Sequence, residues 1–130
     1  MPNLLGVLIA CIVSIGIGAL WYSPVLFGNV WMKLTGFDKK KIEEAKKKGM
    51  VKSYLISFLG ILVMVYILGY LMDATSISFV LLAVLIWRGF MATTALSVVL
   101  WEGKSFKLYL INVLHHLVVL LTAGVILSLF

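Results

Sequence analysis

Cysteine and acidic side chains are scarce in this chain of 130 residues. Cys11 is the single cysteine, so the chain offers neither an internal disulfide nor a pair of redox-active thiols. Asp and Glu together number 5, and the long apolar blocks contain no paired carboxylates. A nucleophile–base motif, a phosphate-binding loop and metal-ligand spacing are missing as well. We therefore expect no enzymatic activity, no metal site and no bound cofactor.

Apolar residues, by contrast, make up 63% of the chain and give a mean hydropathy of +1.15. A soluble domain is about half apolar, and one soluble core of this size could not bury such an excess. Roughly 20 helical residues cross a bilayer core of about 30 Å. Four unbroken apolar blocks reach this length, at about residues 4–22, 51–72, 77–100 and 106–129. The sequence predicts an all-α membrane protein, a single domain over residues 1–130 with four transmembrane helices.

Pro24 interrupts the apolar residues that extend the first block through Leu34. Proline has no backbone N–H to donate, so we expect a kink or a break of the helix just after Trp21-Tyr22-Ser23. The aromatic rings on both sides of this break suit the inner membrane interface, where such rings settle.

Lysine is concentrated on one side of the predicted membrane domain. Eight of the 11 basic residues lie around the loop between the first two spans, namely Lys33, Lys39, Lys40, Lys41, Lys46, Lys47, Lys48 and Lys52. The net charge of +6 does not indicate nucleic-acid binding, because no arginine-rich tract or base-stacking aromatic set accompanies these lysines. Basic loops stay in the cytoplasm, so both termini are expected outside. The loop over about residues 33–50 would face anionic lipid.

This basic loop has helix signals of its own. Asp38 can cap a helix, Glu43 and Glu44 stand four residues before lysines, and Gly49 can end the helix. One interpretation is a surface helix at the inner leaflet, and the other is a solvated loop that only sets the orientation.

Two segments resemble each other within the chain. Val51–Val63 and Phe106–Val118 are identical at seven of thirteen positions, including a Lys-x-Tyr pair at the start of each. Aliphatic matches arise easily by chance, so the Lys-x-Tyr pair carries more weight. The alignment suggests a parallel two-helix internal repeat about an axis along the membrane normal.

Small residues form stripes on two of the predicted spans. Those of the first span are Gly6, Ala10, Ser14 and Gly18, and those of the third span are Gly89, Thr93 and Ser97. Such stripes let another helix approach closely, either within one chain or between copies. A four-helix protein this small often needs partners to enclose a site, and we expect a homo-oligomer.

Arg88 is the outlier among the polar residues, because it lies near the middle of the third span. An arginine at the centre of a membrane helix costs about 2.5–3.5 kcal/mol on insertion. Asp73 and Glu102 lie at the outer and inner edges, so neither is at that depth. Arg88 could bind an anion or lipid phosphate, pair with a carboxylate of another subunit or face a water-filled cavity. It could also snorkel or donate to backbone carbonyls.

Two adjacent histidines, His115 and His116, lie near the same depth in the fourth span. Asn112 is expected on the face of His116, four residues away. Neighbouring helix positions point about 100° apart, so the pair does not form a metal clamp. Histidines at this depth can relay protons or bind a ligand, and they can also hydrogen-bond another helix. Thr93 completes the set of polar candidates, unless it bonds back to its own helix.

Several motifs resemble a known family. They are Gly18-Ala19-Leu20-Trp21-Tyr22-Ser23-Pro24, Phe27-Gly28, Trp31-Met32, Gly89-Phe90, Ala92-Thr93-Thr94, Glu102-Gly103, Ile111-Asn112 and His116-Leu117. Together they resemble the family called domain of unknown function 1761 over nearly the whole chain. The resemblance implies a small bacterial four-helix membrane protein without an established activity. It carries Trp21, Tyr22, Ser23, Pro24, Asn112 and His116 over as family-like residues, whereas Arg88 and His115 depart from the pattern.

Two functions fit these observations. In the first, a homo-oligomer binds or transports a small solute or anion at a site formed by Thr93, Asn112 and His116, with Arg88 supplying positive charge. In the second, the chain is a non-catalytic accessory or scaffold subunit that docks on a larger membrane complex. A membrane enzyme is a distant third.

Overall fold

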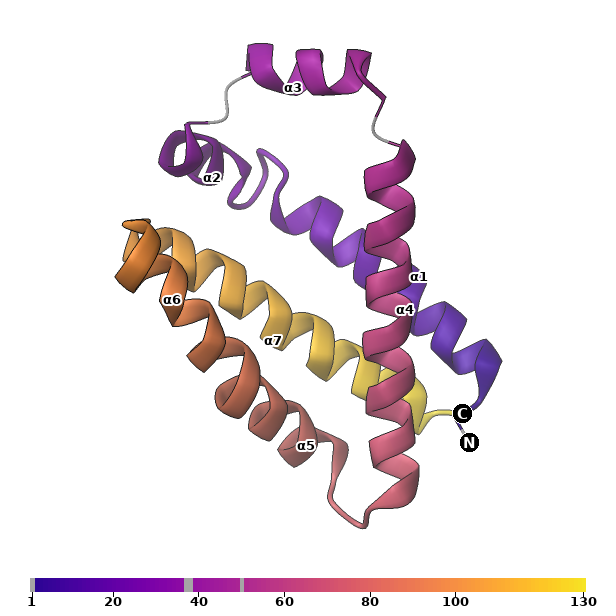
Figure 1. The fold of residues 1–130 in the computed structure, drawn as a ribbon. Helices are drawn as coiled ribbons and strands as arrows, with labels where there is room; N and C mark the ends of the chain where they lie inside the picture. The colour runs from indigo at the N-terminus through magenta and orange to yellow at the C-terminus, as the bar shows by residue number, and fades with distance from the viewer. Residues whose placement is uncertain (1, 37–38, 50) are drawn as a thin grey trace.

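The structure, a computed structural model, describes residues 2–36, 39–49 and 51–130 (Figure 1). Within these residues it is helical apart from short connections, which confirms the all-α prediction. The helices are α1 (Leu4–Trp21), α2 (Gly28–Thr35), α3 (Lys39–Lys47), α4 (Val51–Ala74), α5 (Phe79–Ile86), η1 (Trp87–Met91), α6 (Ala92–Glu102) and α7 (Phe106–Ser128).

Within the described part of the chain, four helices are long and apolar enough to cross a membrane, as expected of a multi-pass membrane protein. They are α1, α4, the continuous helix made by α5, η1 and α6, and α7. The predicted spans at 51–72 and 106–129 differ from α4 and α7 by at most two residues at either end. The long apolar blocks therefore fixed the number of spans correctly.

Side-chain caps start three of these helices. Asn3 Oδ1 accepts from the N–H groups of Leu5 and Gly6 at the start of α1, at 2.9 and 3.2 Å. Ser78 and Ser105 cap α5 and α7 in the same way. These caps satisfy backbone donors that a helix start leaves free. The elements thus begin where short polar residues precede apolar runs.

The helix predicted in the basic loop is present as α3, which lies apart at one end of the molecule (Figure 1). Gly49, soon after α3, has φ +87°, the left-handed conformation suited to the end of a helix. The predicted cap Asp38 lies outside the described residues. The two ends of the chain lie together at the opposite end of the molecule from α3 (Figure 1).

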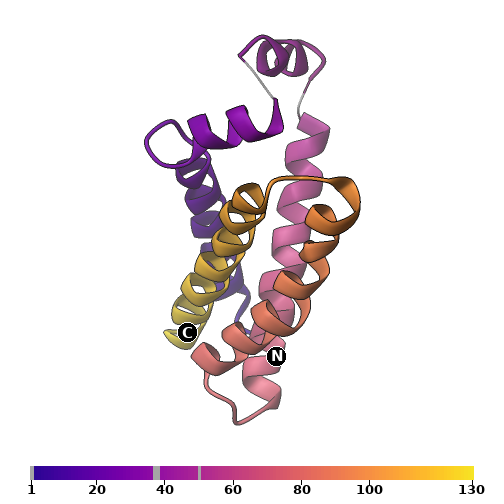
Figure 2. The ribbon, with the colours of Figure 1, turned by 90° about the vertical axis from the view of Figure 1, so that its left-hand side faces the viewer.

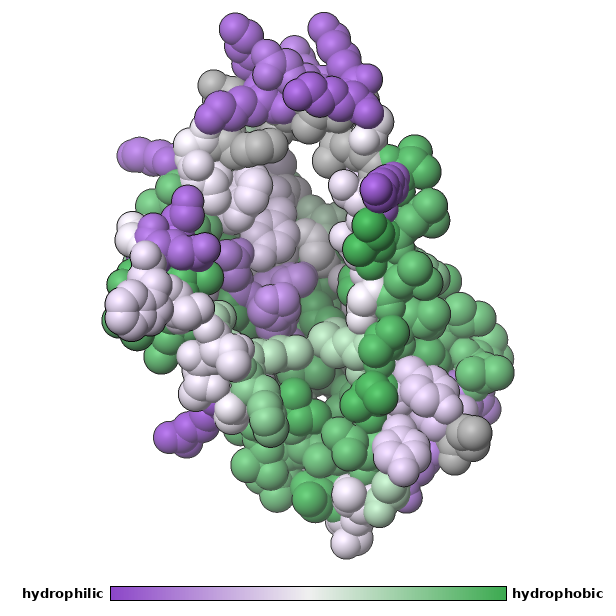
Figure 3. Space-filling view, viewed as in Figure 1, coloured by the Kyte–Doolittle hydropathy of each residue, from purple (hydrophilic) through white to green (hydrophobic). Residues whose placement is uncertain are grey.

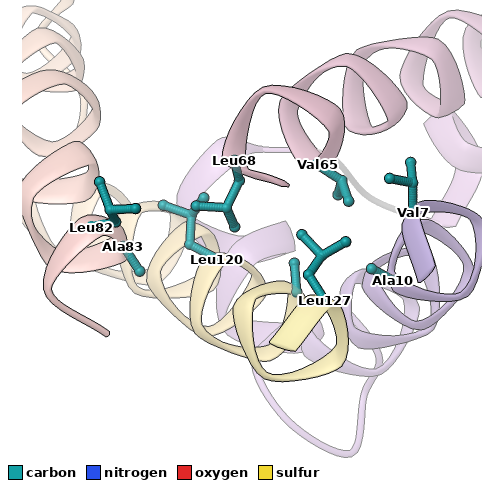
Figure 4. Packing of buried hydrophobic residues seen from close by; sticks show 9 residues of the cluster. Val7, Ala10, Val65, Leu68, Leu82, Ala83, Leu120 and Leu127 are labelled. Carbon is teal, nitrogen blue, oxygen red and sulfur yellow. The ribbon is translucent and has the colours of Figure 1, made fainter. Parts of the chain in front are cut away.

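A small apolar core joins α1, α4, α5 and α7 (Figure 4). Its members are Val7, Ala10, Val65, Leu68, Leu82, Ala83, Leu120, Ala123 and Leu127. Lipid tails are as apolar as these side chains, so the core holds the helices by close packing rather than by removal of water. Eight residues of α7 are buried, more than in any other helix among the described residues. α7 is therefore the central helix.

The second span, α4, leans away from α1 and α7 toward α3 (Figures 1 and 2). Every residue from Val51 to Ser57 is exposed, whereas Val65, Leu68 and Gly69 are buried. α4 is therefore packed against the bundle only in the half nearer the chain ends.

The internal repeat predicts that α4 and α7 run in the same direction, and they do (Figure 1). Their surroundings differ, because α7 is central and α4 is half free. The repeat itself stays a prediction.

One feature of the third span had no sequence signal. Its helix widens to a π turn over η1, where the N–H of Ala92 bonds to the carbonyl of Trp87, five residues back. Arg88 and Gly89 belong to this turn.

Candidate functional site

The Trp-Tyr-Ser-Pro block forms a tight turn at the end of α1. The helix stops at Trp21, as Pro24 predicts, and Ser23 Oγ donates to the carbonyl of Leu20 at 2.6 Å. The N–H of Gly28 then donates to the carbonyl of Ser23 at 2.8 Å, which closes the turn. A Cβ added at Gly28 would lie 2.6 Å from the Ser23 carbonyl carbon, so the turn requires glycine there.

Three aromatic side chains donate hydrogen bonds to three consecutive residues of α7. The pairs are Trp21 Nε1 with the Ile111 carbonyl at 3.0 Å, the Tyr22 hydroxyl with Asn112 Oδ1 at 2.7 Å, and Trp87 Nε1 with the Val113 carbonyl at 2.6 Å. Burial raises the pKa of Tyr22 above its ordinary value, so the hydroxyl keeps the proton that it donates. These rings bind helix to helix in addition to any anchoring at the interface.

His115 lies inside this group of rings. Its ring centroid is 5.3 Å from that of Tyr22, 5.4 Å from that of His116 and 6.0 Å from that of Trp21. A Cβ added at Gly18 would lie 3.3 Å from His115 Nε2, so the ring packs on this glycine. Within the described residues, neither buried ring nitrogen of His115 has a hydrogen-bond partner.

A cavity of about 470 Å³ lies between α1, α4 and α7. Its lining residues are Ser14, Ile15, Gly18, Ala19, Ser57, Gly60, Ile61, Met64, His115, His116 and Val119. This volume is typical of a small-molecule site, and so is an apolar wall with a few polar groups. Figure 3 shows the molecule hollowed below α3, with hydrophilic side chains in the depth of the hollow.

A second cavity of about 60 Å³ lies on the other side of His116. Asn112 and Tyr109 line it together with His116, which confirms that Asn112 and His116 share a face. The Tyr109 hydroxyl donates to the carbonyl of Ala92 at 2.6 Å. About two water molecules would fill this space, so it suits hydration of the histidine rather than a larger ligand.

The structure does not bring Arg88 or Thr93 to the histidines. Both side chains are exposed, and neither lines the two cavities that His116 borders. Thr93 Oγ1 donates to the carbonyl of Gly89 at 2.9 Å, as back-bonding predicts. The predicted site therefore divides into a cavity group of Asn112, His115 and His116 and an outward pair of Arg88 and Thr93.

The stripe on the first span faces the interior of the chain. Gly6, Ala10 and Ser14 are buried, and a Cβ at Gly6 would lie 3.1 Å from the Phe130 side chain. Gly18 receives His115 in the same way, so both ends of the stripe contact residues at or beyond α7. In contrast, the third-span residues Gly89, Thr93 and Ser97 are exposed.

Sequence reasoning missed the contribution of α4 to the cavity. Ser57, Gly60 and Met64 line it at helical spacing, and the pair of small residues three positions apart was the available signal. Sequence reasoning also missed Trp87 as a donor to another helix, because the prediction at this depth rested on Arg88, whose side chain points about 100° away. Among the described residues, no group of three or more His, Cys, Asp and Glu could hold a metal ion.

The family described as protein of unknown function (DUF1761) matches residues 5–128. The chain belongs to this family. The match confirms the resemblance carried by the Trp-Tyr-Ser-Pro turn, which the structure ties to α7. No curated protein and no solved structure matches the chain. Because the family description states no activity, the function of this DUF1761 protein has to be inferred from the cavity and its surroundings.

Proposed function

We propose that this DUF1761 protein binds a small, uncharged and mostly apolar solute in the cavity between α1, α4 and α7. The observation that carries the proposal is His115 at the wall of the cavity, with two ring nitrogens that lack a partner among the described residues. A buried polar group left unpaired costs about 1–3 kcal/mol. Because both His115 nitrogens are covered in the structure, a solute with one hydrogen-bonding group would recover this cost through a turn of that ring toward the cavity.

The lining of the cavity favours an uncharged solute over the anion considered from sequence. No Lys, Arg, Asp or Glu is among the described residues that line it. An ion in a cavity with such apolar walls would lose its hydration without gaining a counter-charge. Arg88, the positive charge expected for an anion, lies on the outward face of the third span.

The route into the cavity favours a solute that dissolves in lipid. α4 stands clear of α1 and α7 from Val51 to Ser57, and these exposed residues are mostly apolar. With basic loops in the cytoplasm, this side corresponds to the inner leaflet of a bacterial cytoplasmic membrane, and both termini are outside. All three walls belong to one chain, so binding does not require the homo-oligomer.

Native mass spectrometry after gentle extraction from the source membrane tests this proposal. The wild-type protein should retain one reproducible uncharged molecule. Gly60→Leu should lose it, because the new side chain enters the cavity without meeting any atom within 4 Å of its Cβ. Gly16→Leu is the matched control, since Gly16 has the same open surroundings but does not line the cavity.

A second variant separates shape from hydrogen bonding. The double substitution His115→Phe with His116→Leu keeps the walls filled but removes both imidazoles, and it should lose the same molecule. A wild-type protein without a retained molecule contradicts the proposal, as does retention by Gly60→Leu. A charged phospholipid as the retained molecule contradicts the uncharged class.

A further inference from the structure

The third span presents an exposed polar face that the cavity does not use. Its members are Arg88, Gly89, Thr93, Thr94 and Ser97, and we call this set the third-span face. α7 packs against the other side of the same helix, through Trp87 and Tyr109. A lipid-facing helix surface normally carries large apolar residues, so small and polar residues here point to contact with protein.

Arg88 sits deep within this face. It lies nine residues after Phe79 and fourteen before Glu102, so its Cα is about 13 Å along the helix from the nearer end. The guanidinium has no hydrogen bond or ion pair with any residue that the structure describes. A charge at this depth is costly unless a partner neutralises it.

The other residues of the third-span face have short side chains, and their hydroxyl groups are already hydrogen-bonded. Thr93 Oγ1 donates to Gly89, Thr94 Oγ1 donates to the carbonyl of Phe90, and Ser97 Oγ donates to the carbonyl of Thr94. A Cβ at Gly89 would meet no atom within 4 Å. A second helix could therefore approach the backbone here without leaving a hydroxyl unpaired.

A second copy of this chain cannot supply the missing counter-charge. The acidic residues of the first loop are outside the spans, and Asp73 and Glu102 stand at the ends of theirs. Two third-span faces packed together would also bring two arginines into one apolar interface. The complementary surface must come from another chain.

From charge, depth and shape we infer that the third-span face docks a transmembrane helix of a different protein, one that carries Asp or Glu near its middle. The carboxylate pairs with Arg88, and the partner backbone lies over Gly89 and Thr93. This interaction is separate from solute binding, because the face and the cavity share no residue.

The test uses resonance energy transfer in phosphatidylcholine vesicles. The full-length protein carries a donor on Ser128→Cys in a Cys11→Ala background, and synthetic leucine-rich transmembrane peptides carry the acceptor. One peptide has a central Glu and its matched control has Gln. The wild-type protein should bind the Glu peptide about three- to tenfold more tightly than the Gln peptide.

Three variants assign the effect to the third-span face. Arg88→Leu should remove the preference for Glu over Gln. Gly89→Leu should weaken binding of both peptides, whereas Gly16→Leu, in equally open surroundings on α1, should leave binding unchanged.

Three outcomes would overturn the inference. The first is equal binding of the two peptides by the wild-type protein. The second is energy transfer between copies of the protein that Gly89→Leu abolishes, because the occupant would then be a second copy. The third is loss of the Glu preference when anionic lipid replaces part of the phosphatidylcholine, because Arg88 would then pair with an anionic lipid headgroup.

Discussion

Asn112, in the first half of α7, joins that helix to the turn that ends α1. Its Oδ1 accepts from the Tyr22 hydroxyl, and both groups are partly buried. Tyr22→Phe and Asn112→Leu should each lower the free energy of unfolding by about 0.5–1.5 kcal/mol. The double variant should cost less than the sum, since only one hydrogen bond is lost. Unfolding in mixed detergent micelles measures all three, and strictly additive losses would contradict the coupling.

Gly28 has less space for an added Cβ than the glycines with no atom within 4 Å, such as Gly16. Its missing Cβ leaves room for the carbonyl of Ser23, so Gly28→Ala must distort the turn. We expect destabilisation of about 1–3 kcal/mol, as for other overpacked sites. Gly16→Ala, with open space around it, should cost nothing and can gain a little helix propensity. Thermal unfolding of the two variants side by side checks the contrast, and equal melting temperatures would refute it.

At the level of single residues, the sequence indicated which side chains matter better than it indicated which residues they contact. The Trp-Tyr-Ser-Pro block stood out, but interface anchoring was the simple interpretation of its rings. Their bonds to Ile111 and Asn112 depend on α1 and α7 lying side by side, which no local pattern encodes. His115 illustrates the same limit, because its position among the rings depends on Gly18 of a distant helix.

The π turn is the element whose effect is easiest to isolate. It holds one residue more per turn than an α-helix, so deletion of Phe90 should convert η1 into regular helix while α5 and α6 keep their faces. Phe90 is 70% exposed, so little packing is lost. We expect a folded, monodisperse protein on size-exclusion chromatography.

The matched control is deletion of Val84 within the regular helix α5. It rotates one part of the third span by about 100° relative to the other and separates core residues from their partners. This variant should aggregate or unfold. If both deletions behave alike, the π turn η1 does not hold an extra residue that the fold can lose.

The number of spans, their approximate ends and the break near Pro24 followed from the sequence because each depends on local chemistry, whereas α2 was not predicted as a separate helix. Apolar length sets the spans, and caps and proline set their limits. The lean of α4 did not follow, because α4 is as apolar along its exposed half as along its packed half. Hydrophobicity alone cannot separate lipid contact from helix contact.

The whole molecule places α3 at one end and both chain ends at the other (Figure 1). If the basic loop is cytoplasmic, a cysteine at Ser76 is outside and a cysteine at Lys48 is inside. In a Cys11→Ala background, a membrane-impermeant thiol reagent should label Ser76→Cys in intact cells and Lys48→Cys only after permeabilisation. The reverse pattern would invert the topology and with it the leaflet from which solute enters.

The two indoles bonded to α7 give this protein an optical reporter of its own assembly. Trp21 and Trp87 report the contacts of α1 and η1 with α7, while Trp101, at 86% exposure, faces the surroundings. Quenchers attached to lipid chains should therefore reduce the fluorescence of Trp101 first. Once Trp31→Phe removes the remaining indole, the emission that survives quenching will follow the contacts of α1 and η1 with α7 without any added label.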